Sequence, residues 1–189
     1  MPAWGWIVVA VLAVIAVLAV IVAVRATLTQ KRSERLKAHF GREYQRVVGE
    51  TGDERAAERE LAARERKHKK LQIVALSAEA QTKYAQHWRS VQTDFVDNPS
   101  GALGAADRLV AQVMRERGYP IDDFDQRAAD ISVDHPDVVE NYRAAHSIHL
   151  SQERSNVGTE QQREAFVHYR VLFEKLLETD KGRPEEARA

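Results

Sequence analysis

The chain has 189 residues, with 28 Lys or Arg, 28 Asp or Glu and no cysteine, so its formal net charge is zero. The lack of cysteine excludes disulfides, zinc–thiolate centres and cysteine nucleophiles. Residues 25–70 carry 14 basic and 8 acidic side chains, whereas residues 71–189 carry 14 basic and 20 acidic ones. An acidic domain without a basic cluster is poorly suited to phosphate backbones, so we expect no nucleic-acid partner.

The most apolar segment comes first. Residues 7–24 read IVVAVLAVIAVLAVIVAV and contain only Ile, Val, Leu and Ala, with Trp4 and Trp6 just ahead of them. A helix over residues 4–24 would cover about 30 Å, the thickness of a bilayer's hydrocarbon core. We therefore predict a transmembrane helix at residues 7–24, bilayer contact over residues 4–24, and a short extracytoplasmic N-terminus at residues 1–6. The alternatives are a buried core helix and a cleaved signal peptide. An 18-residue run without one polar side chain argues against the first. Against the second, no Lys or Arg precedes the run, and the run is longer than about 15 residues.

Basic residues follow this segment directly. Because Lys and Arg near a membrane end stay cytoplasmic, we expect the N-terminus outside and the C-terminal domain in the cytoplasm. The side chains expected to lie against the anionic inner leaflet are Arg25, Lys31, Arg32, Arg35 and Lys37. Ala19 and Ala23 stand four apart on the same helix. Small residues at this spacing let two helices approach closely, so a homo-oligomer stays open.

Residues 25–70 are predicted to form a basic, charged helical stalk. Leu36, Phe40 and Tyr44 make an apolar stripe within residues 29–48. That stripe could lie on lipid headgroups, pair with another copy or fold back on the domain. Residues 53–70 begin acidic and end basic, in agreement with the helix dipole, and Leu61 is their only large apolar residue. We expect this second stretch to be a solvated helix outside any core.

Residues 71–179 are the only stretch expected to build a core, as a compact bundle of about five helices, which makes the chain all-α. Ser77 is a good N-cap for the first helix, and Asn98-Pro99 ends it. Two further helices are predicted at about residues 100–117 and 123–131. A fourth is expected to open with Pro136 in its first turn, and Thr159 with Gln162 matches a capping box for the last. Residues 180–189 are expected to be a disordered tail.

Three histidines are candidates for a metal site. His146 and His149 stand three apart on one predicted helix and so share a face, and His168 lies on the last helix. Imidazole suits zinc, copper, iron or nickel. The alternative is that they are polar boundary residues, because the Glu of the HExxH pattern is missing. The sequence implies no cofactor.

The segment between the second and fourth helices of the bundle is the predicted contact surface for an unknown protein partner. Loops between helices often carry function, and this one gathers aromatic and charged side chains: Tyr119, Asp122, Asp123, Phe124 and His135. The acidic residues Asp122, Asp123 and Asp125 also resemble part of a calcium loop. That loop's glycine and distal glutamate are missing, and the preference for acids at a helix start is the simpler explanation.

No phosphate-binding or nucleophile motif occurs in the chain, so an enzyme is not indicated, although a site assembled from dispersed residues stays open. The leading hypothesis is a membrane-tethered helical interaction or scaffold protein. The alternatives are a metal- or ligand-sensing domain that uses the three histidines, and an enzyme with a dispersed site.

Two phrases carry a resemblance. They are MRERGYPIDDFDQRAADISVDHPDVVENYRAAH, residues 114–146, and HYRVLFEKLL in the last predicted helix. Together with the N-terminal apolar segment, the chain resembles a family of uncharacterised bacterial proteins, often actinobacterial, that are helical and anchored in the membrane by a single span. The resemblance implies a bacterial inner membrane and one folded C-terminal domain, and it implies no activity, cofactor or catalytic residue.

Overall fold

The computed structural model describes the backbone of residues 3–155 and 157–178; the side chains of residues 3–11, 14, 15, 22, 26 and 153 lie outside the description. Over these residues the chain forms helices and no strand, which confirms the all-α prediction. The helices are α1 (Ala3–Phe40), α2 (Arg42–Thr51), α3 (Glu54–His68), α4 (Ala78–Asp97), α5 (Pro99–Glu116), α6 (Phe124–Asp134), α7 (Val139–Arg154) and α8 (Thr159–Leu177).

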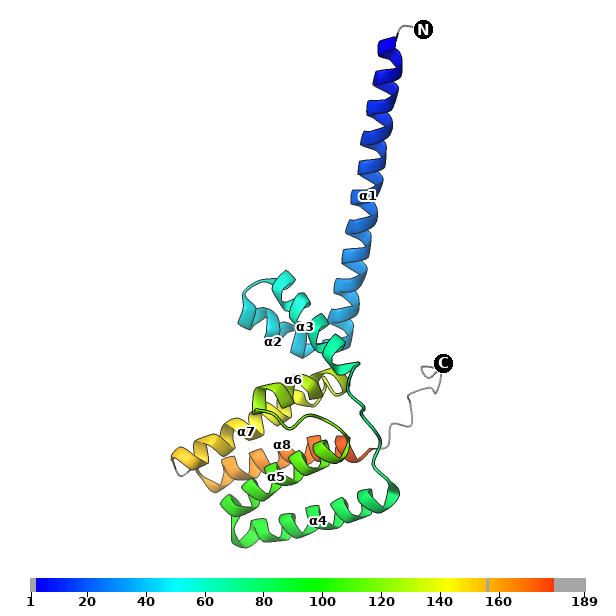
Figure 1. Cartoon of the computed structure of the whole chain (residues 1–189). Coiled ribbons are helices and arrows are strands. Elements are labelled where there is room, and N and C mark those ends of the chain that lie inside the picture. Colours follow the sequence, from blue (N-terminus) through cyan, green and yellow to red (C-terminus); the bar gives the residue numbers. More distant parts are fainter. Residues whose placement is uncertain (1–2, 156, 179–189) are drawn as a thin grey trace.

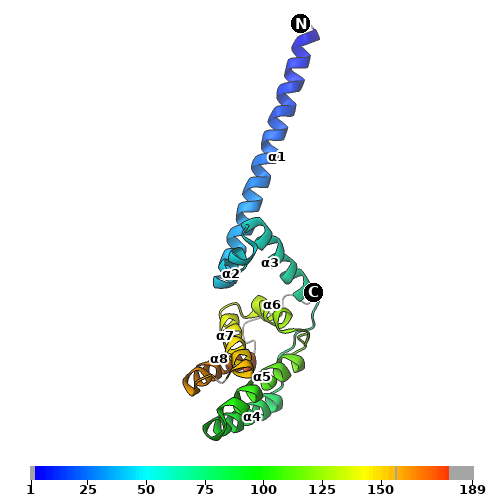
Figure 2. The same ribbon diagram turned by 90° about the vertical axis from the view of Figure 1, so that its left-hand side faces the viewer.

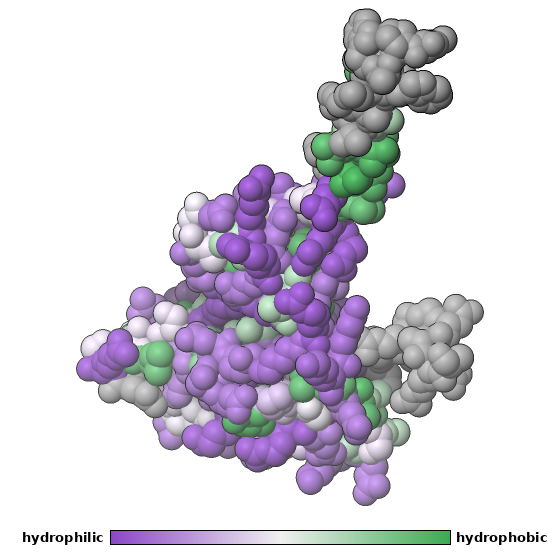
Figure 3. Space-filling view, turned by 45° about the horizontal axis from the view of Figure 1, so that its top comes forward, coloured by the Kyte–Doolittle hydropathy of each residue, from purple (hydrophilic) through white to green (hydrophobic). Residues whose placement is uncertain are grey.

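Helix α1 is 38 residues long, and most of it projects away from the rest of the molecule (Figures 1 and 2). Its projecting part exposes large apolar side chains, which stand out above a mostly hydrophilic body in Figure 3. They are Leu12, Val17, Leu18, Val20, Ile21, Val24 and Leu28, each 45–62 % exposed. Among the described residues, no helix meets the length and hydropathy needed to cross a membrane. The predicted span 7–24 falls partly, and Trp4 and Trp6 fall wholly, on side chains outside the description.

Below the projecting part, residues 33–68 fold into a small unit that we call the neck. Helix α1 ends at Phe40. Gly41 follows it with a φ of +50°, in the left-handed region that glycine adopts most readily, and α2 leaves in a new direction. Gly52, at φ +67°, closes α2 by donating its N–H to the Val48 carbonyl at 2.9 Å. Asp53 then caps α3 by accepting from the backbone N–H groups of Arg55 and Ala56.

The neck has its own hydrophobic core. The side chains buried in it are Leu36, Phe40, Tyr44, Val47, Ala57, Leu61 and, from α6, Val133. The stripe on residues 29–48 therefore packs inside the neck, on α3 and on Val133 of α6. Among the three alternatives that the sequence left open, folding back on the domain comes nearest to this arrangement. The prediction that residues 53–70 form a solvated helix was wrong, because Ala57 and Leu61, four residues apart, share one buried face.

The bundle comprises α4–α8 and holds the larger core. Trp88 of α4 stacks on two rings of α8, with centroid distances of 4.9 Å to Phe166 and 4.6 Å to Phe173. The predicted cap is confirmed, since Ser77 Oγ accepts from the Ala80 N–H at 3.1 Å. An extended segment, residues 71–77, links the neck to α4 (Figure 2).

Two predicted helix starts were wrong. Pro136 lies in a turn that precedes α7, which begins only at Val139. Thr159 is already the first residue of α8, with Gly158 at the cap position and no side-chain cap. Gln162 does not form a capping box: its amide oxygen, the acceptor that such a box needs, accepts from Ser100 Oγ at 3.3 Å, and its amide nitrogen donates to Gln152 Oε1 at 2.8 Å and to the Val157 carbonyl at 2.9 Å. The predicted tail, residues 180–189, lies outside the described residues.

Candidate interaction groove

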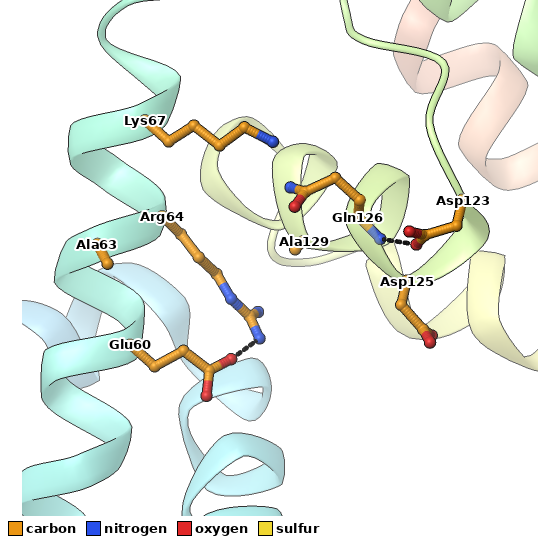
Figure 4. Close-up of a pocket in the computed structure, with 8 residues that line it drawn as sticks. All are labelled: Glu60, Ala63, Arg64, Lys67, Asp123, Asp125, Gln126 and Ala129. Carbon is orange, nitrogen blue, oxygen red and sulfur yellow. Dashed lines mark hydrogen bonds and ion pairs between the residues drawn. The ribbon is translucent and has the colours of Figure 1, made fainter.

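The neck and the bundle meet along a surface groove between α3 and α6, which we call the α3–α6 groove (Figure 4). Its volume is about 660 Å³. Four residues from each side line it: Glu60, Ala63, Arg64 and Lys67, then Asp123, Asp125, Gln126 and Ala129. Ala63 and Ala129 stand among the longer polar side chains, and because their methyl groups are small they leave space that larger residues would fill.

The two walls of this groove differ in whether their charged side chains form ion pairs. Both cations of the α3 wall are already paired. Arg64 contacts Glu60, and Lys67 Nζ lies 3.5 Å from Asp130 Oδ2. On the other wall, Asp123 and Asp125 form no ion pair within the described part of the chain. One wall of the groove therefore presents to solvent two exposed carboxylates that form no ion pair with any described residue.

Behind the groove lies a buried carboxylate, Glu43 of α2, which is 0 % exposed. Arg143 of α7 donates two hydrogen bonds to it, at 2.6 and 3.0 Å, and Arg46 of α2 donates two more, at 2.8 and 3.0 Å. Arg64 of α3 adds a fifth, at 2.7 Å. Three guanidinium groups from three helices thus surround one carboxylate, and Arg64 belongs both to this network and to the groove.

The protonation of Glu43 follows from this setting. Burial by itself raises the pKa of the carboxyl group, but the hydrogen bonds from Arg46 and Arg143 outweigh it and bring the pKa to about 2. Glu43 is therefore ionised at any physiological pH. Because its partners come from α2, α3 and α7, this charged group holds the neck against the bundle.

A second polar cluster joins the neck to the bundle at the C-terminal end of α6. His68 Nε2 lies 2.6 Å from Asp134 Oδ2, and the Tyr119 hydroxyl donates to the same oxygen at 2.6 Å. His68 is 7 % exposed and Tyr119 2 % exposed. Nearby, His39 Nε2 lies 3.0 Å from the Val133 carbonyl oxygen. These contacts join the neck to α6 of the bundle, as does the Lys67–Asp130 pair, whereas the Glu43 network joins it to α7.

The predicted contact surface is only partly at the surface. Asp122 and Asp123 are exposed, and Asp123 both lines the groove and caps α6, accepting from the Gln126 N–H at 2.8 Å. Tyr119 is buried, so its assignment as a contact residue was wrong. Phe124 is half-buried, with its ring stacked on His146 at a centroid distance of 3.7 Å. His135 is half-buried as well, and desolvation lowers its pKa.

The three candidate metal ligands do not converge. The His146 and His149 rings are 6.4 Å apart, and His168 Nδ1 instead lies 2.7 Å from Asn141 Oδ1. His146 Nδ1 is 3.9 Å from Asp107 Oδ1, while burial lowers the pKa of its imidazole. In the described part of the chain, no group of three His, Asp or Glu side chains is arranged to hold a metal ion.

Beside His146, two tyrosines fill the interior between α5, α7 and α8. The Tyr169 hydroxyl donates to Asp107 Oδ1 at 2.9 Å, and burial raises the pKa of both phenols, that of Tyr142 to about 12. Both therefore stay protonated at neutral pH, where Tyr169 acts as a hydrogen-bond donor. The two tyrosines and Asp107 are therefore polar residues within the core of the bundle.

No pattern in the sequence indicates the Glu43 network. Glu43 and Arg143 are 100 positions apart, and each looks like an ordinary surface residue on a charged helix. The α3 wall of the groove was missed for the same reason, because residues 53–70 looked uniformly solvated. Of the five residues named for the predicted surface, only Asp123 lines the observed groove.

No family model, curated protein or solved structure matches the chain.

Proposed function

We propose that this chain is a membrane-tethered helical interaction protein, in which α1 anchors the molecule and the neck and bundle present the α3–α6 groove to a partner. The observation that carries the proposal is the projecting part of α1. Its large apolar side chains between Leu12 and Leu28 are exposed and stand clear of the neck and the bundle. Exposed apolar surface costs about 25 cal/mol per Å², so this rod requires an apolar environment to cover it.

A bilayer is the environment that best suits such a helix. A helix satisfies its own backbone hydrogen bonds, and the run at residues 7–24 holds no polar side chain that would have to be buried in lipid. With this anchor, the positive-inside rule favours a cytoplasmic neck and bundle. The bacterial inner membrane itself stays a prediction that rests on the family resemblance.

The basic collar after the anchor is smaller than the sequence suggested. Arg35 is paired with Glu65 at 2.8 Å and Lys37 with Glu54 at 3.2 Å. The remaining collar residues are exposed and form no ion pair within the described residues: Arg25, Lys31 and Arg32. They lie within eight residues of Val24, about 12 Å along the helix axis, which suits contact with anionic headgroups.

The same geometry would hold the body close to the membrane. Arg35 is eleven residues after Val24, or about 16 Å along the axis, and its guanidinium already contacts α3. Because α1 continues unbroken into the neck, and the Glu43 network ties the neck to the bundle, the groove would keep a fixed height below the bilayer. Tethering of this kind raises the local concentration of a binding surface without any new contact.

The cysteine-free chain allows a direct test of this arrangement. Single cysteines replace Pro2 ahead of the anchor and Gln92 on the exposed surface of α4, and a membrane-impermeant maleimide is added to intact bacterial spheroplasts. We expect Pro2→Cys to be labelled in intact cells and Gln92→Cys only after permeabilisation, with no labelling of the parent chain. Labelling of Gln92→Cys in intact cells would contradict the proposed topology.

A further inference from the structure

We infer that the α3–α6 groove binds a Lys- or Arg-rich juxtamembrane segment of another membrane protein. This inference rests on the proposed function for the location of the partner, and on the groove itself for the partner's charge.

The charge argument starts from the lining. It contains three carboxylates and two cations, and both cations are already held by carboxylates of this chain: Arg64 by Glu43 and Glu60, and Lys67 by Asp130. Asp123 and Asp125 form no ion pair among the described residues, and exposed Asp122 precedes them. The charge still lacking a partner in this groove is therefore negative, and a basic segment complements it.

The shape of the groove suits a peptide segment. Each wall is one face of a helix, formed on α3 by residues at i, i+3, i+4 and i+7 and on α6 chiefly by Asp125, Gln126 and Ala129. The small side chains of Ala63 and Ala129 leave room for a backbone, and the volume of about 660 Å³ accommodates a few residues (Figure 4). Charged side chains at the rims supply polar partners, as is usual at the edges of protein interfaces.

The location selects the class of partner. If α1 anchors the chain, the α3 wall begins about 16 Å of helix below the bilayer, because Arg35 contacts Glu65 at that height. Protein segments found at this depth on the cytoplasmic side are the flanks of membrane-spanning helices, and these are enriched in Lys and Arg. A basic flank of a neighbouring membrane protein therefore has both the charge and the position that the groove requires.

The test uses the purified full chain in neutral detergent micelles, which remove lipid charge from the measurement. The probe is a fluorescein-labelled peptide of alternating lysine and alanine, with a glutamate–alanine peptide of equal length for comparison, and binding is followed by fluorescence anisotropy. The double variant Asp123→Asn, Asp125→Asn removes the two groove carboxylates that form no ion pair within the described chain, and Asn still caps α6. The matched control, Asp94→Asn with Asp97→Asn, removes two exposed carboxylates from α4.

We expect the lysine peptide to bind and the glutamate peptide not to bind. The groove variant should bind the lysine peptide about tenfold more weakly, whereas the α4 variant should bind it as the parent chain does. Equal affinity of the parent and the groove variant, or an equal loss in the α4 variant, would overturn the inference. So would self-association of the chain through this groove, seen as a dimer that the groove variant abolishes. Because the assay contains no bilayer, its outcome is independent of whether the chain is membrane-anchored.

Discussion

Glu43 is the residue on which the junction between neck and bundle most depends. Its carboxylate is fully buried and accepts hydrogen bonds from three guanidinium groups, so its removal would leave those groups close together without a counter-charge. Breaking a buried ion pair by removing one partner typically costs about 3–5 kcal/mol. We expect Glu43→Gln to lower the free energy of unfolding by about 3 kcal/mol, measured by urea denaturation with circular dichroism.

The control for that substitution is Glu160→Gln. Glu160 also forms an ion pair, with Arg163 at 2.6 Å, but it lies on the exposed start of α8. Exposed pairs contribute little to stability. The control should leave the unfolding midpoint where it is in the parent chain, and a similar loss in both variants would show that burial of Glu43 is not the cause.

The low pKa of Glu43 also predicts a dependence on pH. The folded-state pKa of about 2 lies below the ordinary value of 4.5, so the stabilisation from ionised Glu43 is complete above about pH 4.5 and is lost as the pH falls towards 2. The stability difference between the parent chain and Glu43→Gln should therefore shrink when unfolding is measured at pH 3 rather than at pH 7. A difference that stays constant over this range would contradict the assigned pKa.

At the scale of elements, the same Gly-to-Ala substitution is expected to have opposite effects in the turn after α5 and inside α2. Gly118 has φ +93°, and a Cβ at this position would collide with the Gln72 carbonyl oxygen. Gly49, in contrast, lies inside α2 with open space around it. Gly118→Ala should destabilise the fold by more than about 1 kcal/mol, through strain and through displacement of the linker. Gly49→Ala should stabilise it by about 0.5–1 kcal/mol, because alanine favours the helix.

Thermal unfolding of both variants would decide the point. If the Gly118→Ala variant were as stable as the parent chain, that result would contradict the close packing of the linker against the turn after α5.

The elements themselves follow largely from local signals. The Ser77 cap, the Asn98-Pro99 break and the apolar spacing of α4, α5 and α8 each depend on residues within a few positions of one another, and the bundle of five helices could be predicted from them. The start of α8 could not, because Gln162 is engaged by Gln152 across the α7–α8 connection.

The neck and the groove could not be predicted either, because they too depend on contacts between residues that are distant in the sequence. Alanine gives no periodic signal of its own, so the buried face of α3 at Ala57 and Leu61 looked like a solvated helix. The Glu43 network joins positions up to 100 residues apart, and its charged side chains resemble those of any exposed helix. Of the candidate site residues, Asp123 could be placed at a helix start from sequence, but the α3 wall opposite it depends on tertiary packing.

At the scale of the whole molecule, the chain combines a projecting apolar rod, a charged neck and a larger bundle (Figures 1 and 3). Polar links at Glu43 and at Asp134 connect the neck to the bundle, and α1 runs without a break from the rod into the neck. Under the proposed function, movement of the anchor in the plane of the membrane would therefore carry the groove with it.

The most direct test of the account is extraction of membranes with alkaline carbonate. The parent chain should stay in the membrane pellet, as should Val74→Asp with Val96→Asp, which adds two charges at exposed apolar positions of the bundle region. Ala16→Asp with Val17→Asp places two charges at the centre of the proposed span, at a cost of about 5–7 kcal/mol, and should move the protein to the soluble fraction. A parent chain that carbonate releases, or one whose pelleting is unchanged by the charges in α1, would contradict the membrane tether.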